Sequence, residues 1–529
     1  MSRMGSATLV LVFISSPAIY GQQEQTRPQP TDRIVLEEVQ RDVSPPLRDI
    51  VPVPSDMASA TRFEREMHEA ELAERVRPES SLRTGPAASA LTPSIGVPAA
   101  LVSTTEGLNF QGISSDGWVA PDTNGAVGAT QFVQWVNVEF AIYNKSTGNL
   151  IYGPAAGNTL WSGFGGLCQN TNNGDPIVLY DQSAARWVMT QYANGGSAYY
   201  QCVAVSQTSD ATGKYFRYAF QLSSFFPDYS KLGVWPDAYY LSTNLEDPVK
   251  NFALQGALVC ALNRSRMLSG LSAPSVCFQM SPAAGHTLLP SDWDGSVAPP
   301  TGSPNFLINL GSNALRLWKF HVDFQTPGNS TLTGPTTIAV TSFTKACGGG
   351  VCVPQKHTKQ TLDSLGDRLM HRLVYRRFSD GHESIVANHS VGSPAAIRWY
   401  EIRSPNGTPT IFQQGTFRPD SNWRWMGSIA TDKVGDIAVG YSVSGGNMYP
   451  AIRYAGRVPS DPLGTLESEK TIVSGFGSQR QQSRWGDYSA MSVDPADDCT
   501  FWYTNEYLIT DGSKNWKTRI ASFKFSNCQ

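Results

Sequence analysis

The stretch GDPIVLYD at residues 174–181, continued by RWVM at residues 186–189, recurs as RWGDYSAMSVD at residues 484–494, continued by CTFWY at residues 499–503. Each copy has an acidic residue before a short apolar strand, then an Asp turn, then an aromatic strand. Alternation of apolar and polar residues between turn residues is typical of antiparallel β-strands. Helical periodicity is nearly absent after residue 106. These stretches therefore predict an all-β fold built from a repeated unit.

The repeat extends along the rest of the chain. A third copy reads RWMGSIATD at residues 424–432, and weaker copies begin near positions 122, 237, 305 and 367. The starts at 122, 175, 237, 305, 367, 427 and 487 lie 53 to 68 residues apart. Repeats of this length with four strands each are typical of β-propeller blades, which bury their faces only against their neighbours. We expect a seven-bladed β-propeller; the alternatives are six or eight blades, or a pair of β-sandwiches.

Two units indicate how the ring is built. The second unit shows four predicted strands, at residues 176–180, 186–192, 199–206 and 215–221. The last unit shows only three and ends at Phe525. Residues 107–113 could supply its missing outer strand, which would join the two ends of the propeller.

Composition excludes several classes of protein. The 529 residues carry 41 Lys and Arg against 44 Asp and Glu, with 47 Gly and 34 Pro. This low charge and high turn content exclude a disordered or long-helix protein. A net charge of −3 provides no basic field for a phosphate backbone, so nucleic acid is not an expected partner.

The N-terminal region differs from the body. Residues 1–21 resemble a secretory signal peptide, with Arg3 before a short apolar run and small residues after it. Residues 22–105 are Pro-rich, with one charged helical stretch near residues 62–76, and are expected to form a linker or propeptide, disordered or partly helical. Residues 106–529 form the predicted propeller. No later segment reaches the ~18 apolar residues of a membrane helix. With the signal peptide, this indicates a secreted protein, which we expect to be a monomer.

The eight cysteines agree with secretion. They are even in number and scattered over the body, and in an oxidising compartment such cysteines usually pair. Pairing of neighbours closes the shortest loops, although the sequence does not prove the connectivity. The expected pairs are Cys168 with Cys202, Cys260 with Cys277, Cys347 with Cys352, and Cys499 with Cys528.

The aromatic strands, Asp turns and expected secretion make the chain similar to the sialidase-like and related carbohydrate-acting propellers. The resemblance covers residues 106–529 in architecture. The Asp-box that sialidase-like chains repeat has no full copy here, and residues 404–408 (SPNGT) are a fragment of it. The resemblance implies a carbohydrate ligand and transfers no catalytic residue.

The repeat predicts which side chains meet. In a propeller, the starts of the innermost strands and the ends of the second strands lie on one axial face, where ligands usually bind. The resulting candidates for substrate binding are Asp122, Asp175, Asp237, Arg368, Arg424, Arg484 and Tyr192, and the candidates for catalysis are Asp487, Glu506 and His389.

These residue types suit a polysaccharide or glycan, including an anionic one, because Arg binds carboxylates and Asp accepts hydrogen bonds from sugar hydroxyls. Asp487 and Glu506 could serve as acid and as nucleophile or base of a glycoside hydrolase. His389 could instead abstract a proton beside a uronate, which would make the protein a lyase. The alternative is a non-catalytic extracellular propeller that binds glycans or a protein, in which the Asp residues cap turns.

The sequence predicts no tightly bound cofactor. It contains no phosphate-binding loop, dinucleotide fingerprint or zinc-ligand spacing. The acidic stretches at residues 292–295 (DWDG) and 494–498 (DPADD) could bind calcium, although neither has full loop spacing, and simple acidic turns are the favoured interpretation.

Overall fold

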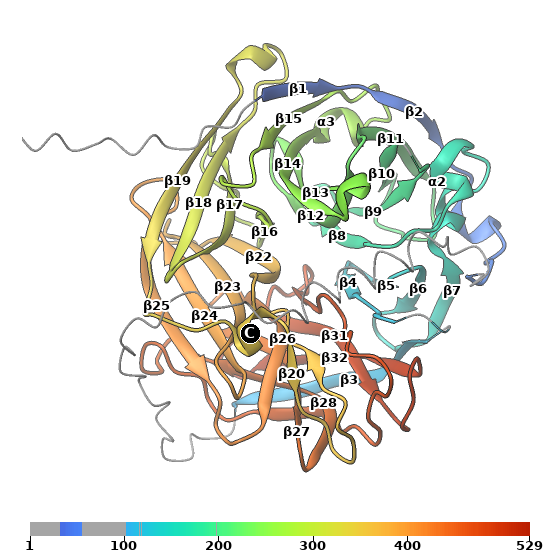
Figure 1. The fold of residues 1–529 in the computed structure, drawn as a ribbon. Coiled ribbons are helices and arrows are strands. Elements are labelled where there is room, and N and C mark those ends of the chain that lie inside the picture. Colours follow the sequence, from blue (N-terminus) through green and yellow to red (C-terminus); the bar gives the residue numbers. More distant parts are fainter. Residues whose placement is uncertain (1–31, 56–101, 116, 118, 197) are drawn as a thin grey trace, which may run out of the picture.

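The structure is a computed structural model that describes residues 32–55, 102–115, 117, 119–196 and 198–529. It is all-β, and its sheets follow one another around a central axis (Figure 1). Most sheets are built from a unit of four consecutive antiparallel strands, of which the first lies nearest the axis. The predicted all-β class is confirmed.

The units follow the chain in order. The first three are β4 (Thr123–Val127) to β7 (Leu150–Ala156), β8 (Ile177–Asp181) to β11 (Tyr215–Ser223), and β12 (Phe226–Val234) to β15 (Ser275–Met280). Their middle strands are β5 (Gln131–Val136), β6 (Glu139–Asn144), β9 (Arg186–Asn194), β10 (Tyr199–Ser206), β13 (Ala238–Asp247) and β14 (Ala253–Asn263). Short helices occur only in connections within the described residues, as α2 (Gly166–Asn170) and α3 (Arg264–Met267).

The later units continue the ring. They are β16 (Leu289–Asp294) to β19 (Thr331–Ala339), β22 (Met370–Arg377) to β25 (Thr410–Phe417), β26 (Trp423–Thr431) to β29 (Lys470–Val473), and β30 (Ala490–Val493) to β32 (Trp516–Phe525). Their middle strands are β17 (Asn305–Gly311), β18 (Ala314–His321), β23 (Glu383–Val391), β24 (Ala396–Arg403), β27 (Ile437–Gly445), β28 (Met448–Arg457) and β31 (Thr500–Leu508).

One pair of inner strands is joined directly. β16 and β22 pair in parallel, with Ser291 opposite Leu373 and Asp294 opposite Arg376. This pairing merges two units into an eight-stranded sheet. The long connection between them carries a small sheet of β20 (Val351–Val353) and β21 (Leu362–Asp363). At this point of the ring, the inner strands of two neighbouring units are therefore joined directly by backbone hydrogen bonds.

The first and last parts of the body meet in one sheet. β3 (Thr104–Ser114) pairs antiparallel with β32, with Thr104 opposite Phe525. This is the outer strand that the sequence predicted near residues 107–113. The last unit is therefore completed by a strand from the beginning of the body.

Part of the expected linker is ordered, in contrast to the prediction of a disordered or partly helical extension. β1 (Asp32–Leu36) pairs with β15, and β2 (Glu38–Val43) pairs with β11, so each adds a fifth strand to the outer edge of a unit (Figure 1). The sequence reasoning weighed the Pro-rich surroundings and overlooked the alternation in residues 32–43. Unpaired edges of a sheet provide hydrogen-bonding groups for such a strand. The predicted signal peptide and the helical stretch near residues 62–76 lie outside the described residues.

Two predicted unit starts have a different place in the structure. Positions 237 and 305 lie at the beginnings of the second strands β13 and β17, whereas the inner strands of these units begin at Phe226 and Leu289. The Trp-Pro-Asp turn at residues 235–237 resembles the punctuation before an inner strand, which explains the shift. The four strands predicted for the second unit match β8 to β11.

Large aromatic side chains fill the space between neighbouring units. Trp135, Trp187 and Trp425 are among nine fully buried tryptophans. A Cβ atom at Gly128, in the first unit, would lie 2.5 Å from the ring of Trp187 in the second. The absence of a side chain at Gly128 therefore allows the two sheets to approach closely.

All four expected disulfides are present. They join Cys168 to Cys202, Cys260 to Cys277, Cys347 to Cys352, and Cys499 to Cys528. Each bond is local, with a sequence separation of 5 to 34 between its partners. In the part of the chain that the structure describes, no helix is long and apolar enough to span a membrane.

A buried arginine fastens the N-terminal strands to the second unit. Arg217 is 1% exposed and donates to both carboxylate oxygens of Asp42, at 2.8 and 2.6 Å. It also donates to the carbonyl oxygens of Leu160 and Ser162. The carboxylate of Asp42 therefore balances a charge that water does not reach.

We predict that Asp42→Asn lowers the free energy of unfolding by about 1–3 kcal/mol, because a buried guanidinium loses its counter-charge and one acceptor. Chemical denaturation measures the change. The matched control is Asp49→Asn, which removes an exposed carboxylate nearby and should leave stability unchanged. Equal stability of the two variants would contradict a fastening role for residues 32–43.

Two buried carboxyl groups share a turn at the far end of β26. The Oδ1 atom of Asp432 accepts from the backbone N–H groups of Val434 and Asp436, and Asn527 donates to Asp436 at 2.7 Å. Burial, and then the charge of Asp436, raise the pKa of Asp432 to about 8. The protonation of the two carboxyls is therefore coupled.

This pair predicts that stability declines as pH rises from about 4 to about 8. The pKa of Asp432 is higher in the folded than in the unfolded chain, so its contribution is full below the ordinary Asp range and is lost as pH rises toward about 8. Asp436→Asn removes the neighbouring negative charge and should make the protein more stable at pH 8 by about 1–3 kcal/mol. Denaturation at several pH values measures it; an unchanged pH profile in this variant would contradict the coupling of the two carboxyls.

Candidate functional site

Three aspartates from different units lie where the inner strands begin. Asp122 precedes β4, Asp175 lies two residues before β8, and Asp487 lies three residues before β30. The backbone N–H of Asp487 donates to Asp122 Oδ1 at 2.7 Å, and the backbone N–H of Tyr229 donates to Asp175 Oδ2 at 2.9 Å. Each contact crosses from one unit to another, so the carboxylates help to join the units at the axis.

Basic groups accompany these carboxylates. Arg484 forms an ion pair with Asp487, with 2.8 Å between Nη2 and Oδ1. Arg368 donates to Asp367 at 2.9 and 3.2 Å, and its guanidinium carbon lies 4.7 Å from the ring centre of Tyr229. Positive charge thus reaches the same end of the axis from the connection that carries Asp487 and from the one before β22.

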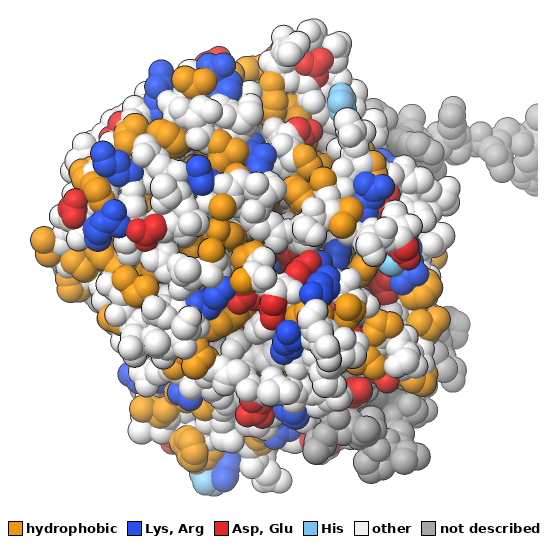
Figure 2. All heavy atoms as spheres, turned by 180° about the vertical axis from the view of Figure 1, so that it is seen from behind, with side chains coloured by type: hydrophobic (Ala, Val, Ile, Leu, Met, Phe, Trp, Pro, Cys, Tyr) orange, Lys and Arg blue, Asp and Glu red, His pale blue; other side chains and the backbone are white. Residues whose placement is uncertain are grey.

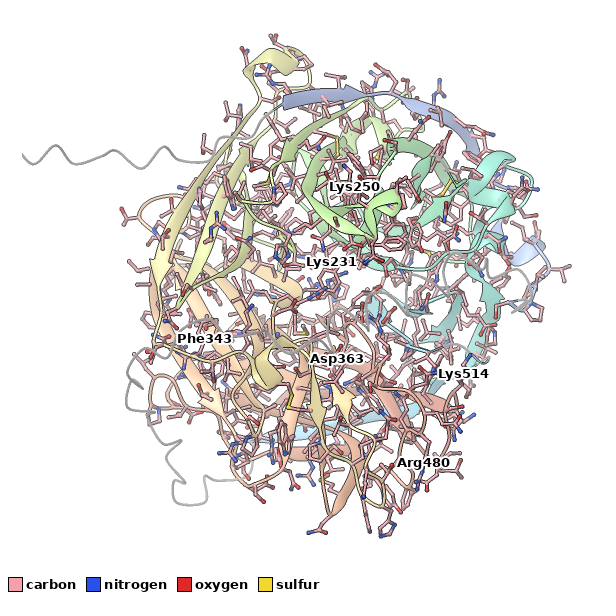
Figure 3. All side chains as sticks on the ribbon, viewed as in Figure 1. Lys231, Lys250, Phe343, Asp363, Arg480 and Lys514 are labelled. Atoms are coloured by element: carbon pink, nitrogen blue, oxygen red, sulfur yellow. A yellow bond between two sulfur atoms is a disulfide. The ribbon has the colours of Figure 1, made fainter. Side chains whose placement is uncertain are left out.

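A buried lysine lies between two tyrosine rings. The Nζ atom of Lys231 is 3.6 Å from the ring centre of Tyr229 and 4.1 Å from that of Tyr488, and it donates to the carbonyl of Ser230 at 2.9 Å. The residue is 1% exposed. Figure 3 places Lys231 near the middle of the ring. Aromatic faces attract a cation and partly replace its hydration.

We call these side chains the axial cluster. It consists of Asp122, Asp175, Tyr229, Lys231, Arg368, Arg484, Asp487 and Tyr488.

Burial shifts the protonation of the axial cluster. The pKa of Asp122 lies well above its usual range, mainly because the carboxyl is buried and then because Asp487 is close, while Arg484 acts in the opposite direction. Burial lowers the pKa of Lys231 to about 8, against the attraction of Asp175, Asp487, Asp228 and Asp122. Burial in the cluster therefore favours the protonated form of the Asp122 carboxyl and disfavours the ammonium form of Lys231.

Glu506 stands next to the axial cluster. It lies in β31 and accepts a hydrogen bond from the backbone N–H of Gly486, beside Asp487. Its pKa is well above the usual range because the side chain is buried, with a further contribution from the charge of Asp487. Its contact with the main chain gives it a role in holding the loop that carries Asp487.

His371 is held in one tautomer. Asn124 Oδ1 accepts from the backbone N–H of Val178 at 2.8 Å, so its amide nitrogen faces His371 Nε2 at 3.2 Å. Because an amide nitrogen only donates, Nε2 must accept and the ring proton must lie on Nδ1. Burial, and then the charges of Lys231 and Arg372, hold the pKa of His371 well below its usual range. The ring is therefore neutral.

The backbone is strained at three of these positions. Asp122, Asp175 and Tyr229 have φ values of 43°, 47° and 57°, in the left-handed region. A side chain in this region costs about 1–3 kcal/mol and is found disproportionately at functional sites. At Tyr229 the pairing of β12 with β13 is interrupted between Asp228 and Lys231. This irregularity lies where both Tyr229 and Lys231 reach the axis.

Six of the ten predicted site residues come together in and beside the axial cluster. They are Asp122, Asp175, Arg368, Arg484, Asp487 and Glu506. Tyr192 lies beside the segment that carries Asp175, because its backbone N–H donates to Gly174 and its ring packs 5.3 Å from that of Phe226.

Three predicted residues have other surroundings. His389 is buried in β23, with Nε2 2.9 Å from the hydroxyl of Tyr400, and burial followed by the charge of Arg398 lowers its pKa to about 3. Arg424 forms ion pairs with Asp420 and Glu469 within its own unit. Asp237 lies in the turn between β12 and β13 and accepts a hydrogen bond from Tyr240. None of these contacts involves the axial cluster.

The sequence reasoning did not place Lys231, Tyr229, Tyr488 or His371 at the axis. The repeat analysis placed the start of the third unit at Asp237. Its actual inner strand, residues 226–234, was therefore not examined for polar groups. The stretch Asp228-Tyr229-Ser230-Lys231 carried the signal, because charged residues interrupt an otherwise apolar strand there. Tyr488 was quoted within the repeat but not considered as a lining residue.

The acidic stretches considered for calcium contact basic side chains. Asp292 and Asp294 both pair with Arg372, at 2.6 and 2.5 Å. Asp494 pairs with Lys145, and Asp498 pairs with Arg376. Cys499, Cys528 and Asp432 also lie close together, but the two sulfurs form a disulfide.

A small cavity lies near the opposite ends of the inner strands. It has a volume of about 20 Å³ and is lined by residues that include Asp292, Asp294, Arg372 and Ser492. A space of this size suits a single water molecule. On the face drawn in Figure 2, acidic and basic side chains gather near the middle and hydrophobic side chains are scattered.

Comparisons with known proteins find no sequence family. No family model matches the chain, and no curated protein matches it. Solved structures that resemble this chain include a protein of unknown function from Dyadobacter fermentans. The two are 10% identical with a TM-score of 0.37, and the aligned region covers 80% of this chain and 99% of that one.

Two further similar structures are those of enzymes named for their action on carbohydrates. The α-L-arabinanase of Penicillium chrysogenum has 10% identity and a TM-score of 0.36, covering 80% of this chain and 100% of its own. An ulvan lyase of polysaccharide lyase family 25 has 10% identity and a TM-score of 0.39, with coverages of 78% and 95%. At these scores the likeness assigns no activity to this chain.

The state of His371 can be tested directly. We predict that its ¹⁵N shifts show a protonated Nδ1 and a bare Nε2, and that the ring stays neutral through the ordinary histidine range near pH 6.5. His371→Gln identifies its signals among those of the seven histidines. A ring that takes up a proton near pH 6.5 would contradict the predicted burial and tautomer.

Proposed function

We propose that the protein is a secreted carbohydrate-active enzyme, and that the axial cluster is the site of a glycoside hydrolase. The observation that carries this proposal is the pairing of two carboxyl groups in different surroundings. Asp122 is buried with a raised pKa, whereas Asp487 forms an ion pair with Arg484. Carboxyl pairs whose environments separate their protonation states are what acid and base catalysis of glycoside cleavage requires.

The roles follow from these surroundings. Asp122, whose burial favours the protonated form, donates its proton to the glycosidic oxygen as the bond to the anomeric carbon breaks. Asp487, paired with the guanidinium of Arg484, either attacks the anomeric carbon or removes a proton from the water that attacks it. The stereochemistry of the product distinguishes these two courses, because only the first retains the anomeric configuration.

Less buried neighbours provide an approach to this site. The side chain of Asp367 is 28% exposed, and Asp175, Asp228 and His286 are partly exposed. Tyr229 and Tyr488 supply aromatic surface beside the carboxylates, and Arg368 provides a guanidinium for an anionic group of a glycan. This arrangement supports binding of a polysaccharide, including an anionic one.

A lyase based on His389 has less support. Its ring packs between Tyr400 and Phe343, and burial favours its neutral form. A non-catalytic glycan-binding propeller would be expected to repeat one whole site in several units, whereas the axial cluster is a single site in which the repeated aspartates meet Lys231 of β12 and Arg368 of the connection before β22.

We infer further that the four-stranded units are the blades of a seven-bladed propeller. Its support is the regular unit order along the chain and the completion of the last unit by β3. Secretion is supported by four disulfides, which persist in oxidising compartments.

Turnover of a panel of polysaccharides and aryl glycosides tests the enzyme. We predict that Asp122→Asn and Asp487→Asn each lower kcat/KM by at least about 100-fold, the usual effect of losing a proton-transfer group. The control is Asp237→Asn, which removes an exposed carboxyl in a turn away from the axial cluster and should retain activity.

Two results would overturn the proposal. One is full activity in either axial variant. The other is a wild-type protein that cleaves nothing on the panel yet retains glycans on an affinity column, which would favour the binding propeller.

A further inference from the structure

We propose that Lys231 is the positioning residue of the axial cluster, whose ammonium, held between Tyr229 and Tyr488, supplies the buried positive charge that lets the carboxylates of Asp122, Asp175 and Asp487 share one site. The mechanism proposed above assigns no role to this side chain. The inference rests on the proposed function for its catalytic meaning, but the electrostatic coupling itself can be measured without a substrate.

The burial of Lys231 is the first observation. Lysines are almost never fully buried unless they are paired, because an ammonium loses its hydration there. Lys231 is 1% exposed, and its Nζ donates to the carbonyl of Ser230 in the same strand. Two aromatic faces at 3.6 and 4.1 Å complete its surroundings. The irregular pairing of β12 at Tyr229 and Ser230 accompanies this placement.

The charges around Lys231 are the second observation. Carboxylates from three neighbouring connections and from its own strand act on it, namely Asp122, Asp175, Asp487 and Asp228. Positive or neutral groups also face the same space: Arg484 beside Asp487, Arg368 beside Tyr229, and the neutral ring of His371. Tyr229 and Tyr488 remain protonated because burial raises their pKa values well above the usual range.

These charges explain why the axial cluster needs a buried cation. Carboxylates in one low-dielectric site repel each other unless cations lie nearby. Arg484 pairs with Asp487, and Lys231 adds a second positive charge that acts on Asp122, Asp175 and Asp487. Asp122 is the carboxyl whose charged form burial disfavours, with a further contribution from Asp487.

Lys231→Met and Lys231→Arg test this assignment on the full-length mature protein. Methionine keeps the apolar stem without charge, whereas arginine keeps the charge. Removing the ammonium should raise the pKa values of the neighbouring carboxyls by about one unit, the lower end of what an adjacent charge does.

The first readout is stability against pH and needs no activity. Folded-state carboxyls with raised pKa values lose their contribution as pH rises. The unfolding midpoint of Lys231→Met should therefore fall relative to wild type between about pH 5 and pH 7, while that of Lys231→Arg follows the wild-type pH profile. The control Lys214→Met, at an exposed position, should show no change with pH. A constant offset at all pH values would mean that Lys231 only fills space, and it would overturn the inference.

The second readout uses whichever glycoside the panel identifies. The acid limb of the kcat/KM profile should move up by about one pH unit in Lys231→Met and stay in place in Lys231→Arg. Lost activity with an unmoved limb would also overturn the positioning role. If no glycoside is cleaved, the stability readout still decides the coupling, so failure of the proposed function and failure of this inference can be told apart.

Discussion

Convergence of the innermost strands on one axis is the constraint on which the rest of this structure depends. The strands approach from all sides and leave little room for side chains. β16 and β22 come close enough to pair in parallel. Elsewhere side chains join neighbours: Asn124 accepts from Val178 of the next unit, and Ser428 accepts from Met491 of another. Polar residues at strand starts are therefore forced into contact across units.

That constraint also creates the axial cluster. Carboxyls that would be exposed turn caps on an isolated sheet become buried at the axis, where each affects the protonation of the others. The cations of Lys231 and Arg484 offset this repulsion, and the rings of Tyr229 and Tyr488 take the place of water. A buried charged group of this kind lowers stability unless it is compensated. Such an arrangement is more readily explained by chemistry at the site than by a contribution to folding.

The outer strands of the ring are not crowded; their unpaired backbone groups instead need hydrogen-bonding partners. Segments that are distant in sequence pair with several of these outer strands. β3 completes the last unit, and β1 and β2 extend two others. The ion pair between Asp42 of β2 and the buried Arg217 of β11 holds β2 on the second unit. The Cys499–Cys528 bond joins the turn between β30 and β31 to the chain after β32. Local crosslinks and added edge strands thus stabilise a fold whose core is divided among many sheets.

The sequence by itself determined the all-β class, the four local disulfides, the strands of the second unit and the outer strand near residues 107–113. These features depend on short-range alternation and turn residues, which act within a few positions of the chain. It also predicted Asp122, Asp175, Arg368, Arg484 and Asp487 together, because a repeat places equivalent residues at equivalent ends.

Only the tertiary structure decided the rest. Local pattern did not reveal that the third unit begins at Phe226, so Lys231 was missed and Asp237 was assigned to the axis. Nor did it show that residues 32–43 are strands, because their partners lie about 175 to 240 residues away in the chain. Protonation states, too, depend on burial and on charges from other units. The physical reason is that pairing partners and solvent exclusion are set by contacts between distant segments, which no local alternation encodes.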